Sequence, residues 1–184
     1  AGDWCAYAKG GSAHLRITGN RIHDCGTGGF TAGQGTGLQF MTAPFLRYEA
    51  YGIVVSGNSV WDTQGAAFGV NGGLNVAIVN NRAWDVGRRS HLIEVVFGLR
   101  SCDGRPGDEG RSRCQANLDA GGWGTTRVDD GDNAVRIPDR NVTIAGNVFG
   151  GPAGRDGQLL SIARPFAGAA QDGLGARVLL DETQ

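Results

Sequence analysis

A short pattern centred on asparagine occurs four times in this chain and constrains its fold more than any other feature. In each copy, alternating apolar residues lead to a Gly or Asn, an Asn follows, and the apolar alternation resumes two residues later. The central residues are Asn20, Asn58, Asn81 and Asn147. Such repetition is typical of architectures in which each unit buries its apolar face against the next. The pattern therefore predicts a β-solenoid, a stack of similar coils.

The spacing of the asparagines predicts one short coil between two coils that carry insertions. Successive asparagines lie 38, 23 and 66 residues apart. An interval of 23 is about what one coil of short strands and turns needs at roughly 3.3 Å per strand residue. When the coils are aligned, both insertions fall at one place, around residues 42–50 and residues 98–140. In the middle coil, the corresponding connection between strands is short and begins at Asn71.

One face of each predicted strand is apolar and should line the interior of the stack. The members of this face are Leu15 and Ile17, Ile53 and Val55, Val76 and Ile78, and Val142 and Ile144. Stacking them requires parallel strands in register. The four asparagines would then form a ladder of side-chain amides that satisfies buried polar groups. We interpret this Asn ladder as structural and not as a site.

The Gly-Asn-x-apolar motif resembles that of the right-handed parallel β-helix proteins of the pectate-lyase-like superfamily. It stands at Gly19-Asn20, Gly57-Asn58 and Gly146-Asn147, with Asn80-Asn81 as a variant, and the resemblance covers about Trp4 to Ile162. It implies an all-β, right-handed parallel β-helix of about four to five coils. Because the superfamily includes lyases, hydrolases, epimerases, phage tailspikes and adhesins without enzymatic activity, the resemblance implies a fold and not one activity. We expect a single β-helix domain over residues 1–184, and a segment of a longer solenoid because the chain opens inside the pattern.

Charge and hydropathy exclude two classes of partner. The formal net charge is −1, whereas nucleic-acid binding normally demands a strongly basic face. No run of about 20 apolar residues is present, so we expect no membrane span. Glycine supplies 33 of the 184 residues without a Gly-X-Y period, which indicates many tight turns between short strands.

Four cysteines allow three disulfide pairings, and sequence proximity favours Cys5–Cys25 and Cys102–Cys114. The second pair would staple the long insertion. An even cysteine count with a loop-closing pair favours a secreted, extracellular or cell-surface setting. No Cys or His spacing supports a zinc site.

A second register lies three positions after each asparagine, at His23, Trp61, Trp84 and Gly150. Alternation from an inward Asn places this register on the outer face, so the aromatic rings should lie one above another. An exposed aromatic column can stack on the apolar face of sugar rings, which makes His23, Trp61 and Trp84 candidate substrate-binding residues. The alternative is that they cover a turn or pack beneath an insertion.

Asp24, Asp62 and Asp85 follow this register immediately. Stacked carboxylates can bind Ca²⁺, which the resemblance makes a natural cofactor, or act as acid and base. Their repetition in every coil favours the alternative, a role in the turn. The long insertion adds Trp123 as a candidate sugar contact. It also holds a weak Ca²⁺ candidate at Asp129, Asp130 and Asp132, which lacks the EF-hand pattern; a solvated loop is the alternative.

The third coil carries the densest polar cluster, formed by Asp85, Arg88, Arg89, His91 and Glu94. In lyases of the superfamily an Arg or Lys abstracts the proton next to a uronic carboxylate. The resemblance therefore makes Arg88 or Arg89 the candidate base, with His91 assisting. Alternatively the arginines project from a turn and pair with Asp85.

These features lead to two expectations about function. The first is an extracellular β-helix module that binds, and in its enzymatic version processes, an acidic polysaccharide. The second is a non-enzymatic structural repeat of a cell-surface fibre or adhesin, with other copies or protein partners bound through open end coils. A lyase would produce unsaturated ends from a uronic polysaccharide, whereas the structural repeat would assemble in an ordered way through its open terminal coils.

Overall fold

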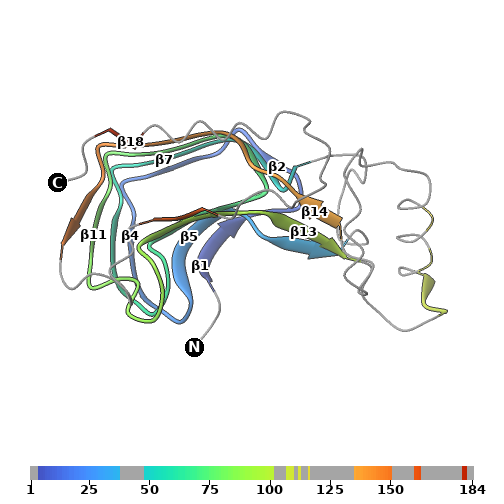
Figure 1. Ribbon diagram of the computed structural model, residues 1–184, viewed down its shortest axis with the longest axis horizontal. Coiled ribbons are helices and arrows are strands. Elements are labelled where there is room, and N and C mark those ends of the chain that lie inside the picture. Colours follow the sequence, from blue (N-terminus) through green and yellow to red (C-terminus); the bar gives the residue numbers. More distant parts are fainter. Residues whose placement is uncertain are drawn as a thin grey trace.

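The computed structural model describes residues 4–37, 48–101, 107–109, 112, 116, 135–150, 160–162 and 180–181. The described chain is all-β, and its strands form three parallel sheets and one smaller mixed sheet (Figure 1). Sheet A contains β1 (Trp4–Ala8), β5 (Gly28–Gly33), β9 (Phe68–Asn71), β12 (Ile93–Val96) and β17 (Leu160–Ile162). Sheet B contains β2 (Ser12–Ala13), β3 (Arg16–Thr18), β7 (Ala50–Ser56), β10 (Gly73–Val79), β15 (Arg140–Ala145) and β18 (Leu180–Asp181). Sheet C contains β4 (Arg21–Cys25), β8 (Ser59–Thr63), β11 (Arg82–Trp84) and β16 (Val148–Gly150).

The chain passes through sheets A, B and C repeatedly in that order, and we call each passage a circuit. Within each sheet, a strand pairs in parallel with the equivalent strands of neighbouring circuits. Figure 1 shows the three sheets around a common interior, with β7 and β18 on one side, β4 and β11 on the next, and β1 and β5 opposite the first. This arrangement of parallel strands is compatible with a β-helix or solenoid.

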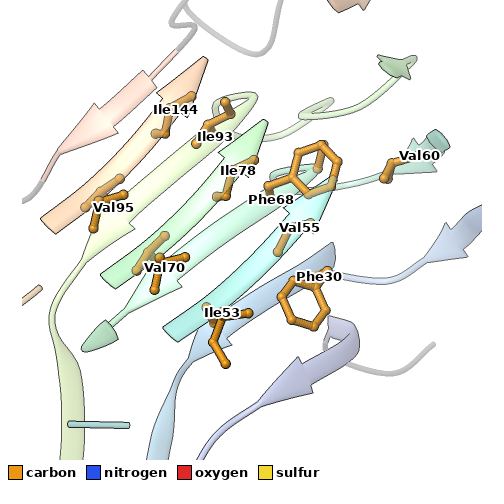
Figure 2. Close-up of a cluster of buried hydrophobic side chains, with 14 of the residues drawn as sticks. Phe30, Ile53, Val55, Val60, Phe68, Val70, Ile78, Ile93, Val95 and Ile144 are labelled. Atoms are coloured by element: carbon orange, nitrogen blue, oxygen red, sulfur yellow. The ribbon is translucent and has the colours of Figure 1, made fainter. Parts of the chain in front are cut away.

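The register of sheet B is the one that the repeat predicts. Val76 of β10 lies opposite Ile53 of β7 and Val142 of β15, and the next inward residues pair in the same way. These side chains are fully buried and meet those of sheet A in the interior (Figure 2). The shared core includes Phe30, Val60, Phe68, Val70, Ile93 and Val95. One apolar stripe per sheet thus builds a single continuous core.

Leu15 departs from the predicted burial, because its side chain is 39% exposed. The pairing of β2 and β3 with β7 keeps Leu15 opposite the buried Ile53, so its register is the predicted one. The left-handed residue before it, His14, has counterparts before the buried first residues of the other circuits and is not the cause of the exposure. Leu15 is exposed because β2 and β3 lie at the edge of sheet B, where only β7 covers them among the described strands.

The passage from sheet A to sheet B is where the circuits differ. Its additional strands are β6 (Gly35–Gly37), β13 (Gly98–Ser101) and β14 (Val135–Ile137), which form a small sheet of their own. Among the described strands, β13 and β14 form the one antiparallel pair. The parallel pairing of β6 with β13 shows that the extra residues of two circuits leave the stack at the same corner, as the spacing predicts.

In the middle circuit this corner is short and is held by a buried carboxylate. Oδ1 of Asp139 accepts hydrogen bonds from the backbone N–H groups of Gly72 and Gly73, both at 2.7 Å. Burial raises the pKa of the Asp139 carboxyl well above its ordinary value, although the two N–H donors oppose this shift. Asp139 therefore ties the fourth circuit to the turn of the third.

The corner from sheet B to sheet C contains the predicted amide ladder. Asn58, Asn81 and Asn147 are each only 1% exposed. The Oδ1 atom of each accepts hydrogen bonds from the backbone N and the Nδ2 of the asparagine one circuit earlier, at 2.9 to 3.0 Å. Asn20 donates to Asn58 in the same way but is itself exposed. The buried amides thus find their partners in the circuits before and after their own.

The predicted disulfide between Cys5 and Cys25 is confirmed, and it joins β1 to β4 with Cα atoms 5.3 Å apart. Cys102 and Cys114 lie outside the described residues, so their pairing stays a prediction. Within the described ranges, none of the helices is long and apolar enough to cross a membrane.

Candidate functional site

A column of three stacked rings stands on the outer face of sheet C. His23 of β4, Trp61 of β8 and Trp84 of β11 occupy one register position on neighbouring strands. The ring centroids of His23 and Trp61 are 4.4 Å apart and those of Trp61 and Trp84 are 4.9 Å apart, with interplanar angles of 13° and 5°. These distances match the roughly 4.8 Å spacing of paired strands, so the sheet itself sets the stacking. The rings lie where the sequence register predicts them.

The column ends in an indole that solvent reaches. Trp84 is 42% exposed although Trp61 covers one of its faces. The next register position on β16 is Gly150, which has no side chain to cover the indole. A Cβ atom built on Gly150 would approach nothing more closely than Cβ of Trp84, at 3.8 Å. Among the described residues, the fourth position of the aromatic register thus holds no side chain over the indole.

Two arginines lie on the same outward face, two positions before the rings. Arg21 precedes His23 on β4 and Arg82 precedes Trp84 on β11, and both are exposed. The guanidinium of Arg21 lies 5.4 Å from the centroid of the Trp61 ring. Within the described part of the chain, neither arginine forms a salt bridge with a carboxylate. The column is therefore flanked by positive charge.

The three aspartates that follow the rings are turn residues. Asp24, Asp62 and Asp85 have left-handed φ values of 57°, 54° and 53°. Asp is one of the few non-glycine residues that tolerate this conformation, which explains its recurrence at this corner. The structure favours the turn role that the repetition indicates.

The carboxylates at this corner are already engaged, and their partners do not suit Ca²⁺. Asp24 contacts the ring of His23 at 2.5 Å, and this hydrogen bond lowers the pKa of the Asp24 carboxyl. Asp62 and Asp85 both bind Arg88, whose charge would repel a cation. Nowhere in the described ranges do three His, Cys, Asp or Glu side chains gather as metal ligands. This donor set does not fit Ca²⁺.

Arg88 joins the corners of two circuits. Its Nη1 lies 2.6 Å from Oδ1 of Asp62, and its Nε donates to Oδ1 of Asp85 at 2.9 Å. The hydrogen bond from Arg88 lowers the pKa of the Asp85 carboxyl. The same hydrogen bond, together with the charge of Asp62, raises the pKa of the Arg88 guanidinium above its ordinary value. A guanidinium held by two carboxylates gives up its proton less readily, which argues against Arg88 as a general base. The alternative pairing with Asp85 is present, and the catalytic roles of Arg88 and Arg89 stay predictions.

A chain of hydrogen bonds between polar side chains begins at Ser90 and His91, directly after Arg88 and Arg89. Oγ of Ser90 lies 3.0 Å from Nδ1 of His91, and Nε2 of His91 lies 3.0 Å from Oε2 of Glu94. Nδ2 of Asn71 then donates to the other oxygen of Glu94 at 3.0 Å, and the hydroxyl of Thr31 donates to Oδ1 of Asn71. The sequence predicts His91 and Glu94 as members of a polar cluster, but not Ser90, Asn71 and Thr31. Asn71 lies opposite Val96 in sheet A and reaches Glu94 across a diagonal, so the repeat gives no signal for this contact.

Four candidate residues of the long insertion lie outside the described residues, namely Trp123, Asp129, Asp130 and Asp132. Their roles in sugar and Ca²⁺ binding stay predictions.

No family model, curated protein or solved structure matches this chain. Its function is therefore argued from the geometry of the site.

Proposed function

We propose that the chain is a right-handed parallel β-helix of about four to five coils, of the kind found in the pectate-lyase-like superfamily. The recurrent order of sheets A, B and C and the buried amide ladder support this proposal. The disulfide between Cys5 and Cys25 supports an extracellular or cell-surface location, because such bonds persist in oxidising compartments.

We propose further that the module binds an acidic polysaccharide along sheet C. The observation that carries this proposal is the exposed indole of Trp84 beside the empty position at Gly150. The C–H face of a pyranose is apolar and stacks on such an indole as another aromatic ring does. Trp61 and His23 hold the indole in place, so little conformational entropy is lost on binding.

The charges beside the column support an acidic ligand. Arg21 and Arg82 share the outward face of the rings and have no salt-bridge partner among the described residues. Their guanidinium groups are suited to the planar carboxylates of uronic sugars, which they can bind through two hydrogen bonds. A neutral glycan would use the indole but not these charges.

The test is a calorimetric titration with polygalacturonate and alginate fragments and with neutral glucans of equal length. We expect the acidic fragments to bind, Trp84→Ala to weaken binding about tenfold or more, and Arg82→Ala to weaken it and reduce its salt dependence. Tyr7→Ala is the matched control, because Tyr7 is 49% exposed on sheet A and far from the register of the column. Equal affinity of wild-type protein and Trp84→Ala would contradict the proposal.

A lyase version of this function assigns proton abstraction to Arg88 or Arg89 with help from His91. It predicts unsaturated products that absorb in the ultraviolet and disappear with Arg88→Ala. The two carboxylates on Arg88 disfavour this version, so we expect binding without this reaction.

The alternative function is a structural repeat of a fibre or adhesin. The buried ladder of Asn58, Asn81 and Asn147 favours it, because hydrogen bonds between successive circuits make the stack rigid. This alternative predicts no glycan binding in the same titration and ordered self-assembly in sedimentation velocity measurements.

A further inference from the structure

The hydrogen-bonded group formed by Ser90, His91 and Glu94 is separate from the ring column and is not used in glycan binding. It lies where the chain leaves the turn after sheet C and enters β12 of sheet A. The turn is held by hydrogen bonds from the backbone N of Arg89 to the carbonyl of Gln64 and from the backbone N of Ser90 to the carbonyl of Gly87. Ser90 is thus fixed in position but remains half-exposed.

The hydrogen-bond partners of His91 determine which of its ring nitrogens carries the proton. An ionised Glu94 can only accept hydrogen bonds, so Nε2 of a neutral His91 carries the proton and donates it. The lone pair of the imidazole then lies on Nδ1, where it accepts the hydrogen bond from the hydroxyl of Ser90 at 3.0 Å. The contact between hydroxyl and imidazole has the geometry of a nucleophile and its base.

Glu94 is held in turn from sheet A. Asn71 of β9 donates to its second oxygen, and Thr31 of β5 donates to Asn71. Glu94 and Thr31 occupy one register column with Gly69 between them, and a side chain at Gly69 would collide with Trp4 and with the hydroxyl of Thr31. The side chains of His91 and Glu94 are each 19% exposed, so solvent weakens their interaction less than at a free surface.

We infer that Ser90, His91 and Glu94 form a nucleophilic site for the hydrolysis of carboxylic esters. Oγ of Ser90 attacks the ester carbonyl while its proton moves to Nδ1 of His91, and Glu94 stabilises the imidazolium that forms. The C–O bond to the alcohol then breaks, and the leaving alkoxide takes the proton from Nδ1. Water attacks the acyl-serine with His91 as base, which releases the carboxylic acid and restores the serine.

This inference does not rest on the proposed glycan site, although the two are close. Ser90 follows Trp84 by six positions, and an extended chain of six residues spans at most about 20 Å. An ester-linked substituent on a polysaccharide held at Trp84 is therefore within reach of the serine. Failure of either proposal leaves the other standing, because small esters require no stacking on the column.

The test uses a fluorophosphonate probe, located by peptide mass spectrometry, and the hydrolysis of p-nitrophenyl acetate. We expect the probe to modify Ser90, and Ser90→Ala or His91→Ala to lower the hydrolysis rate about 10²-fold or more. Glu94→Gln should lower the rate and Glu94→Asp should recover part of it. Ser56→Ala is the control, since Ser56 is a partly exposed serine on β7.

Circular dichroism and the intact Cys5–Cys25 disulfide establish that each variant is folded. A folded wild-type protein that is not modified at Ser90 and does not hydrolyse the ester overturns the inference. Hydrolysis by Ser90→Ala at the wild-type rate overturns it as well.

Discussion

Two corners of the same circuits make an instructive comparison. The corner between sheets B and C repeats an asparagine, and the corner between sheets C and A repeats an aspartate. The asparagines of the second, third and fourth circuits are buried, whereas Asp24, Asp62 and Asp85 are exposed to different degrees at left-handed positions. A polar residue that repeats in every circuit can therefore be buried or exposed, so repetition alone does not predict which corner is open to a ligand.

The physical reason lies in what each side chain requires. An amide carries both donors and acceptors, so stacked asparagines satisfy one another without solvent. A carboxylate only accepts, so stacked aspartates need water, backbone N–H groups or a cation such as Arg88. The aspartate corner must stay open, and the candidate functional groups lie on either side of it.

The largest expected effect comes from breaking the asparagine corner. Asn81→Ala leaves the backbone N and Nδ2 of Asn58 without their acceptor and the carbonyl of Val55 without its donor. We expect a loss of about 3–5 kcal/mol in the free energy of unfolding, because each buried group left unsatisfied costs roughly 1–3 kcal/mol. Urea unfolding measures it. Asn20→Ala, at the exposed asparagine, should cost about 1 kcal/mol, and equal losses would show that the ladder is not stabilised by burial.

The next effect concerns the disulfide that secures the aspartate corner of the first circuit. Cys25 follows Asp24 directly and is bonded to Cys5, 20 residues earlier. Replacing both cysteines with serine should lower the free energy of unfolding by about 3 kcal/mol, from the entropy of the released loop. Thermal unfolding of the double variant and of the wild-type protein measures it. A melting temperature unchanged in the double variant would contradict this role.

The third prediction concerns the contribution of a buried carboxylate, Asp139, to stability at the corner between sheets A and B. Asp139→Ala should cost about 2–4 kcal/mol, because the N–H groups of Gly72 and Gly73 lose their acceptor. Asp139→Asn keeps an acceptor oxygen and should cost about 1 kcal/mol or less. Comparable losses in the two variants would show that the hydrogen bonds are unimportant.

The same residue makes stability depend on pH. Burial raises the pKa of Asp139 in the folded protein, so the folded state holds this proton more tightly than the unfolded chain. Its contribution should fall as pH rises above the ordinary value of 3.8 and level off above the raised pKa. Asp139→Asn should remove this slope, as measured by urea unfolding at a series of pH values. A wild-type slope that persists in Asp139→Asn would assign it to other groups.

The smallest effect separates backbone conformation from charge at the aspartate corner. Asp62→Val should cost about 1–2 kcal/mol more than Asp62→Asn, because a β-branched residue is strained at a left-handed φ. Both variants remove the carboxylate from Arg88, so their difference isolates the backbone. Equal stabilities in thermal unfolding would mean that the turn is not what selects aspartate.

The features that repeat could be predicted from the sequence. The inward faces, the Asn ladder, the ring column and the Cys5–Cys25 bond all follow from one register applied to successive circuits. Leu15 keeps this register but is exposed, because its strand lies at the edge of sheet B. The repeat predicts which residues face inward but not which strand lies at the edge.

Contacts between residues at different register positions could not be predicted from the repeat. The pairing of Arg88 with Asp85 is local in sequence and could be predicted, but the second partner of Arg88, Asp62, belongs to the circuit before. The link from Glu94 to Asn71 likewise crosses circuits along a diagonal of sheet A. Such contacts depend on side-chain conformations, which the repeat does not determine.

The most direct test of the glycan-binding account covers the exposed face of Trp84 with an aliphatic side chain. Gly150 does not adopt a left-handed backbone, and a Cβ atom there meets only an ordinary contact with Trp84 among the described residues, so Gly150→Ile should fold and cover the indole without adding an aromatic ring. Calorimetric titration with the acidic fragments should then show binding lost as fully as in Trp84→Ala, with the free energy of unfolding unchanged or slightly higher. Binding by Gly150→Ile at the wild-type affinity would contradict the account.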